Sequence, residues 1–162
     1  MNTYLKKIYT LEEAGENCEA LKNSGKRIVF TNGCFDILHP GHARYLSSAR
    51  ELGDYLIVAL NSDRSVRAIK GRKRPIFPEK KRAELLAALE CVSCVVIFDE
   101  NNPLQIIKYL LPHILVKGGD WQEDQIIGAD VVKADGGEVQ RIPFFNGYST
   151  TDIIKKIVQR YT

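Results

Sequence analysis

Two histidines, His39 and His42, flank a Pro-Gly pair just after the segment Thr31-Asn32-Gly33-Cys34-Phe35-Asp36. They lie where a short apolar run gives way to a helical pattern, and the free backbone N–H groups of a helix start can bind phosphate. An imidazolium can donate to a phosphate whose negative charge grows in a transition state. A tight turn with two surface histidines is the alternative interpretation. The pairing at a strand-to-helix junction favours function, and we predict both histidines to be catalytic.

A second polar stretch, residues 61–76, contains six basic side chains and follows another apolar run. A basic loop of this kind suits transient clamping of phosphate oxygens. The alternatives are a solvated surface loop and a nucleic-acid patch. The stretch contains no aromatic residue that stacks on a base, which disfavours nucleic acid as the partner.

Two further segments combine glycine with polar residues. In 116–121, Val-Lys-Gly-Gly-Asp-Trp, the paired glycines permit close approach of a ligand, and Asp120 can accept from a base or a sugar hydroxyl. In 147–152, Gly-Tyr-Ser-Thr-Thr-Asp, three hydroxyls open a helical pattern. The alternatives are a common turn and an ordinary helix N-cap. In the second segment both interpretations can hold, with Ser149 capping the helix and Thr150 binding phosphate.

Apolar periodicity predicts the elements that position these motifs. Helices are expected at 11–24, 41–52, 79–90, 103–111 and 149–160, and strands at 27–31, 55–60, 95–98 and 114–117, with candidate short strands at 129–133 and 138–142. Alternating strands and helices indicate an α/β fold: a Rossmann-like, doubly wound, mostly parallel sheet. Each motif then lies beyond a strand's carboxyl end or at a helix start, where such sheets bind ligands.

The bulk composition is that of one globular domain. The 162 residues carry 23 basic and 20 acidic side chains, and the net charge of +3 is too small to indicate a nucleic-acid partner. No apolar run is long enough to span a bilayer and no signal peptide is apparent, so we expect a cytoplasmic protein without membrane partners. The four cysteines are then reduced, and Cys91 and Cys94 are predicted to be small core residues. His113, between Pro112 and a strand, is predicted to be structural.

The Thr-Asn-Gly-Cys-Phe-Asp segment and its His-Pro-Gly-His continuation resemble the H-x-G-H region of the cytidylyltransferase-like nucleotidyltransferase superfamily. The lead-in is similar to the adenylyltransferase domains of the ADP-heptose synthesis enzymes, D-glycero-β-D-manno-heptose 1-phosphate adenylyltransferases. Runs similar to Val-Arg-x-x-Lys-Gly-x-x-Arg-Pro, Val-Lys-Gly-Gly-Asp and Gly-x-Ser-Thr-Thr follow in the same order, so the resemblance covers about residues 26 to 160. It implies transfer of AMP from ATP to a sugar 1-phosphate with release of pyrophosphate.

The resemblance also assigns residues to roles. His39, His42 and Lys70 are the expected catalytic residues. The nucleotide is expected to contact Thr31, Asn32, Gly33, Cys34, Phe35, Gly41, Arg74, Lys117, Gly119, Asp120, Ser149, Thr150 and Thr151. The sugar phosphate is expected to contact Asp36, Asn61 and Arg67, with Asp36 either binding a sugar hydroxyl or orienting the first loop. No protein metal site is expected, and Mg²⁺ accompanies ATP, held largely by phosphate oxygens and water.

One position departs from the related glycerol-phosphate cytidylyltransferases, which carry Arg where this chain has Phe144. A cytidylyltransferase acting on glycerol 3-phosphate or a related alcohol phosphate nevertheless stays open as an alternative. From another class, a non-catalytic nucleotide-binding or RNA-binding module would use the basic 64–74 stretch. The resemblance further implies a homodimer. The related enzyme is often fused behind a sugar kinase, and here we expect a stand-alone version with a leader helix (1–25) before the nucleotidyltransferase domain (26–162).

Overall fold

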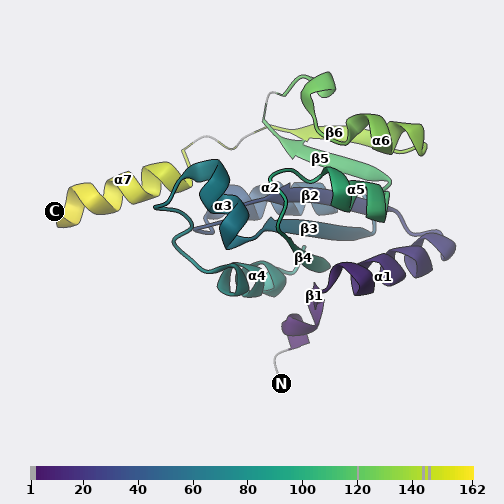
Figure 1. Cartoon of the computed structure of the whole chain (residues 1–162), viewed down its shortest axis with the longest axis horizontal. Coiled ribbons are helices and arrows are strands. Elements are labelled where there is room, and N and C mark those ends of the chain that lie inside the picture. Colours follow the sequence, from purple (N-terminus) through teal and green to yellow (C-terminus); the bar gives the residue numbers. More distant parts are fainter. Residues whose placement is uncertain (1–2, 120, 144, 146) are drawn as a thin grey trace.

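The computed structural model describes residues 3–119, 121–143, 145 and 147–162. Its centre is a six-stranded sheet of order β1-β4-β3-β2-β5-β6 in which every pairing is parallel (Figure 1). The strands are β1 (Ile8–Tyr9), β2 (Ile28–Gly33), β3 (Tyr55–Asn61), β4 (Cys94–Phe98), β5 (Ile114–Gly118) and β6 (Glu138–Ile142). The chain builds outward from β2 to β3 and β4 on one side and then crosses to β5 on the other. The carboxyl ends of β2 and β5 therefore form the switch point at which such sheets bind ligands.

Helices cover both faces of this sheet. The helices are α1 (Leu11–Asn23), α2 (Pro40–Arg50), α3 (Asp63–Lys70), α4 (Glu79–Ala88), α5 (Leu104–Leu110), α6 (Ala129–Ala134) and α7 (Thr150–Tyr161). Helices α1, α5 and α6 contribute to one core, and α2 and α4 to the other. Short 3-10 turns occur at Thr3–Lys7 and Glu123–Gln125. Among the described residues, each helix is too short or too polar to cross a membrane.

Strand residues divide between the two cores in the alternation that a pleated strand imposes. In β2, Ile28 and Phe30 enter the core beneath α1 and α5, whereas Val29 enters the core beneath α2 and α4. All three side chains are 0% exposed. Burial on both faces explains why the strands read as continuous apolar runs. The α/β, doubly wound, parallel fold expected from the sequence is confirmed.

Most predicted elements are confirmed to within a few residues, and two predictions are wrong. Residues 129–133 form α6 and not a strand, because Ala129 and Val132 are buried one helical turn apart after Gly128 at φ +87°. The 61–76 stretch is not all loop, since α3 begins at the cap Ser62, whose Oγ accepts from the N–H of Ser65 at 3.1 Å. Only 71–78 remains as the basic loop.

The N-terminal and C-terminal segments relate differently to the sheet. The predicted leader segment contributes β1, which pairs with β4, and α1, whose Ala14 and Cys18 are buried in the core. By contrast, α7 extends away from the sheet at the C-terminal end (Figure 1) and contains no buried residue. The start of α7 nevertheless lines the cavity described next, so one end of this exposed helix belongs to the site.

Candidate active site

A cavity of about 950 Å³ lies at the carboxyl ends of the strands, where the motifs were expected to meet. It is lined by loops after β2, β3, β4 and β5 and by the start of α7. Fifteen of the predicted site residues line it: Asn32, Gly33, Cys34, Phe35, Asp36, His39, Gly41, His42, Asn61, Lys70, Arg74, Lys117, Ser149, Thr150 and Thr151. The structure thus brings both histidines and the Ser-Thr-Thr helix start into one cavity.

Among the described residues, three predicted site residues are not in this lining. Thr31 is fully buried, and its Oγ1 lies 2.7 Å from the hydroxyl of Tyr45, so it holds a lining residue in place. Arg67 points outward from α3, and Gly119 borders a smaller neighbouring cavity. Asp120 lies outside the described residues.

The two histidines are stacked at the start of α2. Their ring centroids are 3.7 Å apart with an interplanar angle of 22°, and Phe35 meets the His42 ring edge-on at 5.2 Å. His39 is the N-cap of α2, and Pro40 is at its first position, where the fixed backbone angle of proline suits a helix start. A Cβ on Gly41 would stand 3.0 Å from the His39 ring, so glycine here leaves room for the stack.

Burial favours the neutral form of both imidazoles. Burial lowers the pKa of His39; burial and the neighbouring His39 lower the pKa of His42 to about 4, although the backbone at Ile37 opposes the shift. The buried Nδ1 atom of each ring has no hydrogen-bond partner among the described residues. An unsatisfied buried polar atom is costly, so the pair is suited to accept an anionic ligand that supplies partners and raises both pKa values.

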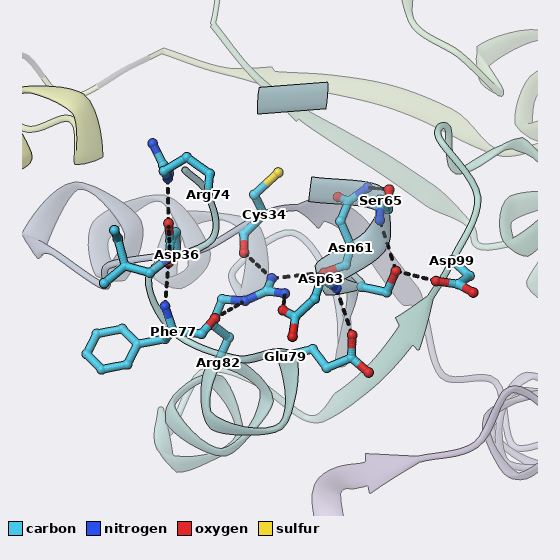
Figure 2. Close-up of polar contacts among 12 residues, drawn as sticks. Cys34, Asp36, Asn61, Asp63, Ser65, Arg74, Phe77, Glu79, Arg82 and Asp99 are labelled. Carbon is cyan, nitrogen blue, oxygen red and sulfur yellow. Dashed lines mark hydrogen bonds and ion pairs between the residues drawn. The ribbon is translucent and has the colours of Figure 1, made fainter. Parts of the chain in front are cut away.

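Asp36 ties the first loop to the basic loop (Figure 2). Its carboxylate accepts from Arg74 Nε at 2.5 Å and from the N–H groups of Ile76 and Phe77 at 2.8 Å and 3.0 Å. Burial would raise the pKa of Asp36, but these donors outweigh burial, and the pKa is lowered. Of the two roles expected for Asp36, the contacts fit that of an orienting group, and the segment it orients is the second loop.

The cations that line the cavity differ in whether they are already in an ion pair. Arg74 is paired with Asp36, while its remaining guanidinium N–H groups have no partner among the described residues. Lys70 is exposed at the end of α3, and it lines the cavity together with Cys34 of the first loop. Burial lowers the pKa of Lys117 and raises that of Cys34. Lys70 and Lys117 line the cavity, and neither is in an ion pair among the described residues, so both ammonium groups are available to an anion.

The start of α7 supplies hydroxyls and backbone N–H groups to the same cavity. Ser149 Oγ accepts from the N–H of Asp152 at 3.0 Å and donates to the Asp152 carboxylate at 2.7 Å, which makes Ser149 the N-cap as predicted. Thr150 and Thr151 begin the helix and line the cavity. Helix starts attract anions because their N–H groups are unpaired and the helix dipole is positive there.

Sequence reasoning missed a further set of lining residues, some of which lie within the motifs but had no predicted role. They are Tyr45, Ile69, Asn101, Asn102, Pro103, Gly118, Ile127, Pro143, Phe145, Gly147, Tyr148 and Asp152; Trp121, left undecided between packing and stacking, also lines the cavity. Asn101 and Asn102 follow β4, and their place beyond a strand end is the signal that would have found them. The sequence correctly placed His113 outside the site, where its Nδ1 accepts from the N–H of Ile28 at 3.0 Å.

The lining has few groups that could ligate a metal. The described residues contain no cluster of three or more His, Cys, Asp or Glu side chains. Asp36 and Asp152 are the carboxylates that line the described part of the cavity, and Asp36 is already engaged by Arg74 and two backbone N–H groups. Such a donor set fits an ion carried in by phosphate oxygens and water, because Mg²⁺ commonly uses one or two carboxylates together with substrate phosphates.

Comparison with known proteins gives a consistent family match. Residues 30–156 match the family described as cytidylyltransferase-like. The bifunctional protein HldE of Pelobacter propionicus is 54% identical over 144 residues, covering 89% of this chain and 30% of the relative, and that of Trichlorobacter lovleyi is 51% identical over 156 residues, covering 96% and 32%. The chain thus spans about a third of the length of these relatives. The crystal structure of a lipopolysaccharide core biosynthesis protein from Thermoplasma volcanium is 30% identical, with a TM-score of 0.62, covering 77% of this chain and 100% of that one.

Proposed function

The chain belongs to the cytidylyltransferase-like family, and we propose that it transfers AMP from ATP to D-glycero-β-D-manno-heptose 1-phosphate, giving ADP-heptose and pyrophosphate. The product would serve as a precursor of lipopolysaccharide or another surface glycan. Support comes from the motif resemblance and from the similarity to HldE proteins and to the lipopolysaccharide core biosynthesis protein. Support for ATP over CTP rests on the motif resemblance, including Phe144 in place of Arg; residue 144 lies outside the described residues.

One observation carries the proposal. The stacked histidines at the start of α2 and the Ser-Thr-Thr start of α7 line one cavity, together with Lys70 and Lys117. Two helix starts and two ammonium groups that line one cavity form a site for a polyanion such as a triphosphate. A module that only binds RNA would leave the histidine pair unused.

The proposed reaction is a single in-line displacement. An oxygen of the sugar 1-phosphate attacks the α-phosphorus of ATP, a new P–O bond forms, and the bond from the α-phosphorus to the bridging oxygen of pyrophosphate breaks. His39, His42 and Lys70 would donate to phosphate oxygens as their charge grows. Ser149 and Thr150 would hold the leaving pyrophosphate.

We propose that Mg²⁺ binds together with ATP. When bound, the ion would neutralise part of the triphosphate charge. The ion would be held mainly by the phosphate oxygens of ATP. Asp36 already binds Arg74, and Asp152 is the remaining carboxylate in the described lining. The chain's own task would be to orient the nucleotide and to keep the reacting oxygens in line.

The cellular setting is also a proposal. We propose a cytoplasmic homodimer that binds ATP and a sugar 1-phosphate and neither nucleic acid nor membrane. In support of the dimer, α7 leaves Ile157, Val158 and Tyr161 exposed by 51%, 52% and 84%, an apolar face that a second copy could cover. Sedimentation equilibrium tests the dimer directly, and a mass of one chain at micromolar concentration would refute it.

A substrate matrix tests the proposed reaction. The protein is incubated with Mg²⁺ and either ATP or CTP, and with either heptose 1-phosphate or glycerol 3-phosphate, and released pyrophosphate and the nucleotide product are measured. We expect turnover with ATP and heptose 1-phosphate and formation of ADP-heptose. Turnover confined to CTP and glycerol 3-phosphate would support the cytidylyltransferase alternative. Tight RNA binding with steep salt dependence and no turnover would support the binding module.

A further inference from the structure

Arg82 of α4 is a fully buried cation that does not line the cavity. Its Nε donates to the carbonyl of Phe77 at 2.9 Å, its Nη1 to the carbonyls of Cys34 at 2.6 Å and Asn61 at 2.9 Å, and its Nη2 to the carboxylate of Asp63 at 2.8 Å (Figure 2). One guanidinium thus joins the ends of β2 and β3, the start of α3 and the loop before α4.

The starts of α3 and α4 are tied together twice. Arg82 binds the carboxylate of Asp63, and Glu79, one turn earlier on α4, accepts from the backbone N–H of Asp63 at 2.7 Å. Two bonds at different points of Asp63 fix the direction in which α3 leaves β3, not just its distance from α4. Lys70 is the last residue of α3, so this direction sets where its ammonium lies.

The basic loop is held from both sides at Phe77. Its N–H donates to Asp36 at 3.0 Å, and its carbonyl accepts from Arg82. Asp36 and Arg82 therefore clamp the loop between the first motif and α4. The segment that follows Lys70 is therefore anchored by its own contacts, in addition to those that hold α3.

A buried charge is a costly way to stabilise a core, because an apolar side chain of similar size often gives equal or greater stability. The planar guanidinium, however, can bind several acceptors in fixed directions at once, which lysine and apolar residues cannot. Arg82 binds four acceptors from four segments around one active-site cavity. This indicates that its role is to hold these segments in fixed positions relative to one another.

We propose that Arg82, with Asp63 and Glu79, is a positioning residue that fixes Lys70 relative to the two catalytic histidines. Arg82 does not contact substrate and acts through α3 and the loop at 71–78. This inference rests on the proposed function, since it assigns the network to the nucleotidyl transfer of the same cavity. It adds a set of residues to the site that lie outside its lining.

A double-mutant cycle on the full chain tests the inference. Asp63→Ala is preferred to Arg82→Ala because the Asp63 side chain is 25% exposed and that of Arg82 is 0% exposed, and it removes the charged partner of Arg82. We expect kcat to fall by about tenfold, with KM for ATP changed less than about twofold, because the lost contact matters in the transition state. In a Lys70→Ala background the same substitution should lower kcat by less than about twofold, since the group it positions is gone.

Arg64→Gln is the matched control. Arg64 is on the same helix and pairs with Asp99 at 2.8 Å, but both side chains are largely exposed and the pair lies outside the network. Its kcat should stay within about twofold of wild type, as is common for exposed ion pairs. Equal losses from Asp63→Ala in the two Lys70 backgrounds would overturn the positioning role and leave a merely structural one.

Amide hydrogen exchange provides a readout that needs no turnover. Asp63→Ala should speed exchange at Ile76 and Phe77, whose N–H groups are held by Asp36 on the far side of the loop. Arg64→Gln should leave exchange at both amides unchanged. If wild type shows no activity with any substrate pair, the proposed function fails, and exchange still decides whether the network holds the loop. Unchanged exchange at both amides would refute the inference.

Discussion

Replacing His42 by alanine separates its chemical role from a structural one. The substitution removes a preorganised donor from the cavity and also the ring on which His39 stacks at 3.7 Å. Loss of one such donor at a reacting oxyanion typically lowers kcat about 10²–10³-fold, which corresponds to about 3–4 kcal/mol of transition-state stabilisation. Because the remaining histidine also loses its support, we expect the upper part of this range.

The effect of this substitution on stability should be small. Alanine removes the buried Nδ1 atom that has no partner among the described residues, which relieves a desolvation cost of about 1–3 kcal/mol. It also removes ring contacts with Phe35 and His39, worth about 0.5–1.5 kcal/mol each. The two effects nearly cancel, so the free energy of unfolding should change by less than about 1 kcal/mol. Pyrophosphate release under single-turnover conditions and thermal unfolding measure the two quantities.

His113→Ala is the matched control, because it should show the opposite pattern. Its Nδ1 accepts the N–H of Ile28 at the start of β2, far from the cavity lining, and alanine leaves that N–H without an acceptor. The cost is about 1–3 kcal/mol, and each kcal/mol lowers Tm by about 2–4 °C in a domain of this size. Turnover per folded molecule should be preserved. If His42→Ala kept kcat within threefold of wild type, or lost activity only in proportion to lost folded protein, the assigned role would be refuted.

Three further predictions follow from the same geometry. Gly41→Ala should lower kcat at least about tenfold without unfolding the protein, because its Cβ would lie 3.0 Å from the His39 ring and disturb the stack; unchanged kinetics would contradict that account. Ser149→Ala removes the acceptor for the Asp152 N–H, so it should weaken ATP binding measured by calorimetry and destabilise the helix by about 1 kcal/mol, whereas Ser149→Asp should restore the cap but not binding. The pKa of His42 is lowered from 6.5 in the unfolded chain to about 4 in the folded protein. As pH falls, the unfolded chain is therefore protonated at His42 before the folded protein is. The free energy of unfolding should decrease as pH falls from about 6.5 to about 4. An NMR titration of the free protein should show a midpoint near pH 4, and a midpoint near 6.5 would show that burial does not control this ring.

The arrangement of strands and helices was predictable because each strand is a short apolar run and each main helix has a regular apolar face. The rim of the sheet was predictable as the site for a related reason, since every polar motif follows a strand end. Two short helices were not predictable in this way. In α3 the basic side chains dominate the pattern, and in α6 the sequence Ala-Asp-Val-Val-Lys-Ala has the β-branched residues of a strand. The Ser62 cap decides the start of α3, and burial of Ala129 and Val132 decides α6, in both cases against residue propensity.

The positioning groups were harder to foresee than the groups in the cavity. Arg82 stands in the run Glu-Lys-Lys-Arg-Ala-Glu, where it looks like one more solvated charge on a helix. Its partners lie 5 to 48 residues away along the chain, so no local pattern contains them. Asp36 resembles a substrate ligand in sequence because its partners, Arg74, Ile76 and Phe77, come from a different loop. The neutral state of the histidines likewise depends on burial that only the folded chain creates.

The chemistry proposed for the cavity explains why its polar residues are used in this way. A phosphate monoester is already anionic near pH 7, so the attacking oxygen needs no protein base. Asp36 would be a poor base in any case, since its bonds to Arg74 and two backbone N–H groups lower its pKa. What the reaction requires is alignment of two polyanions and stabilisation of growing charge, both of which depend on fixed donors. In such a site the buried charges, Asp36 and Arg82, hold the loops in place. The ammonium groups and the imidazole nitrogens then stay available to bind the substrates.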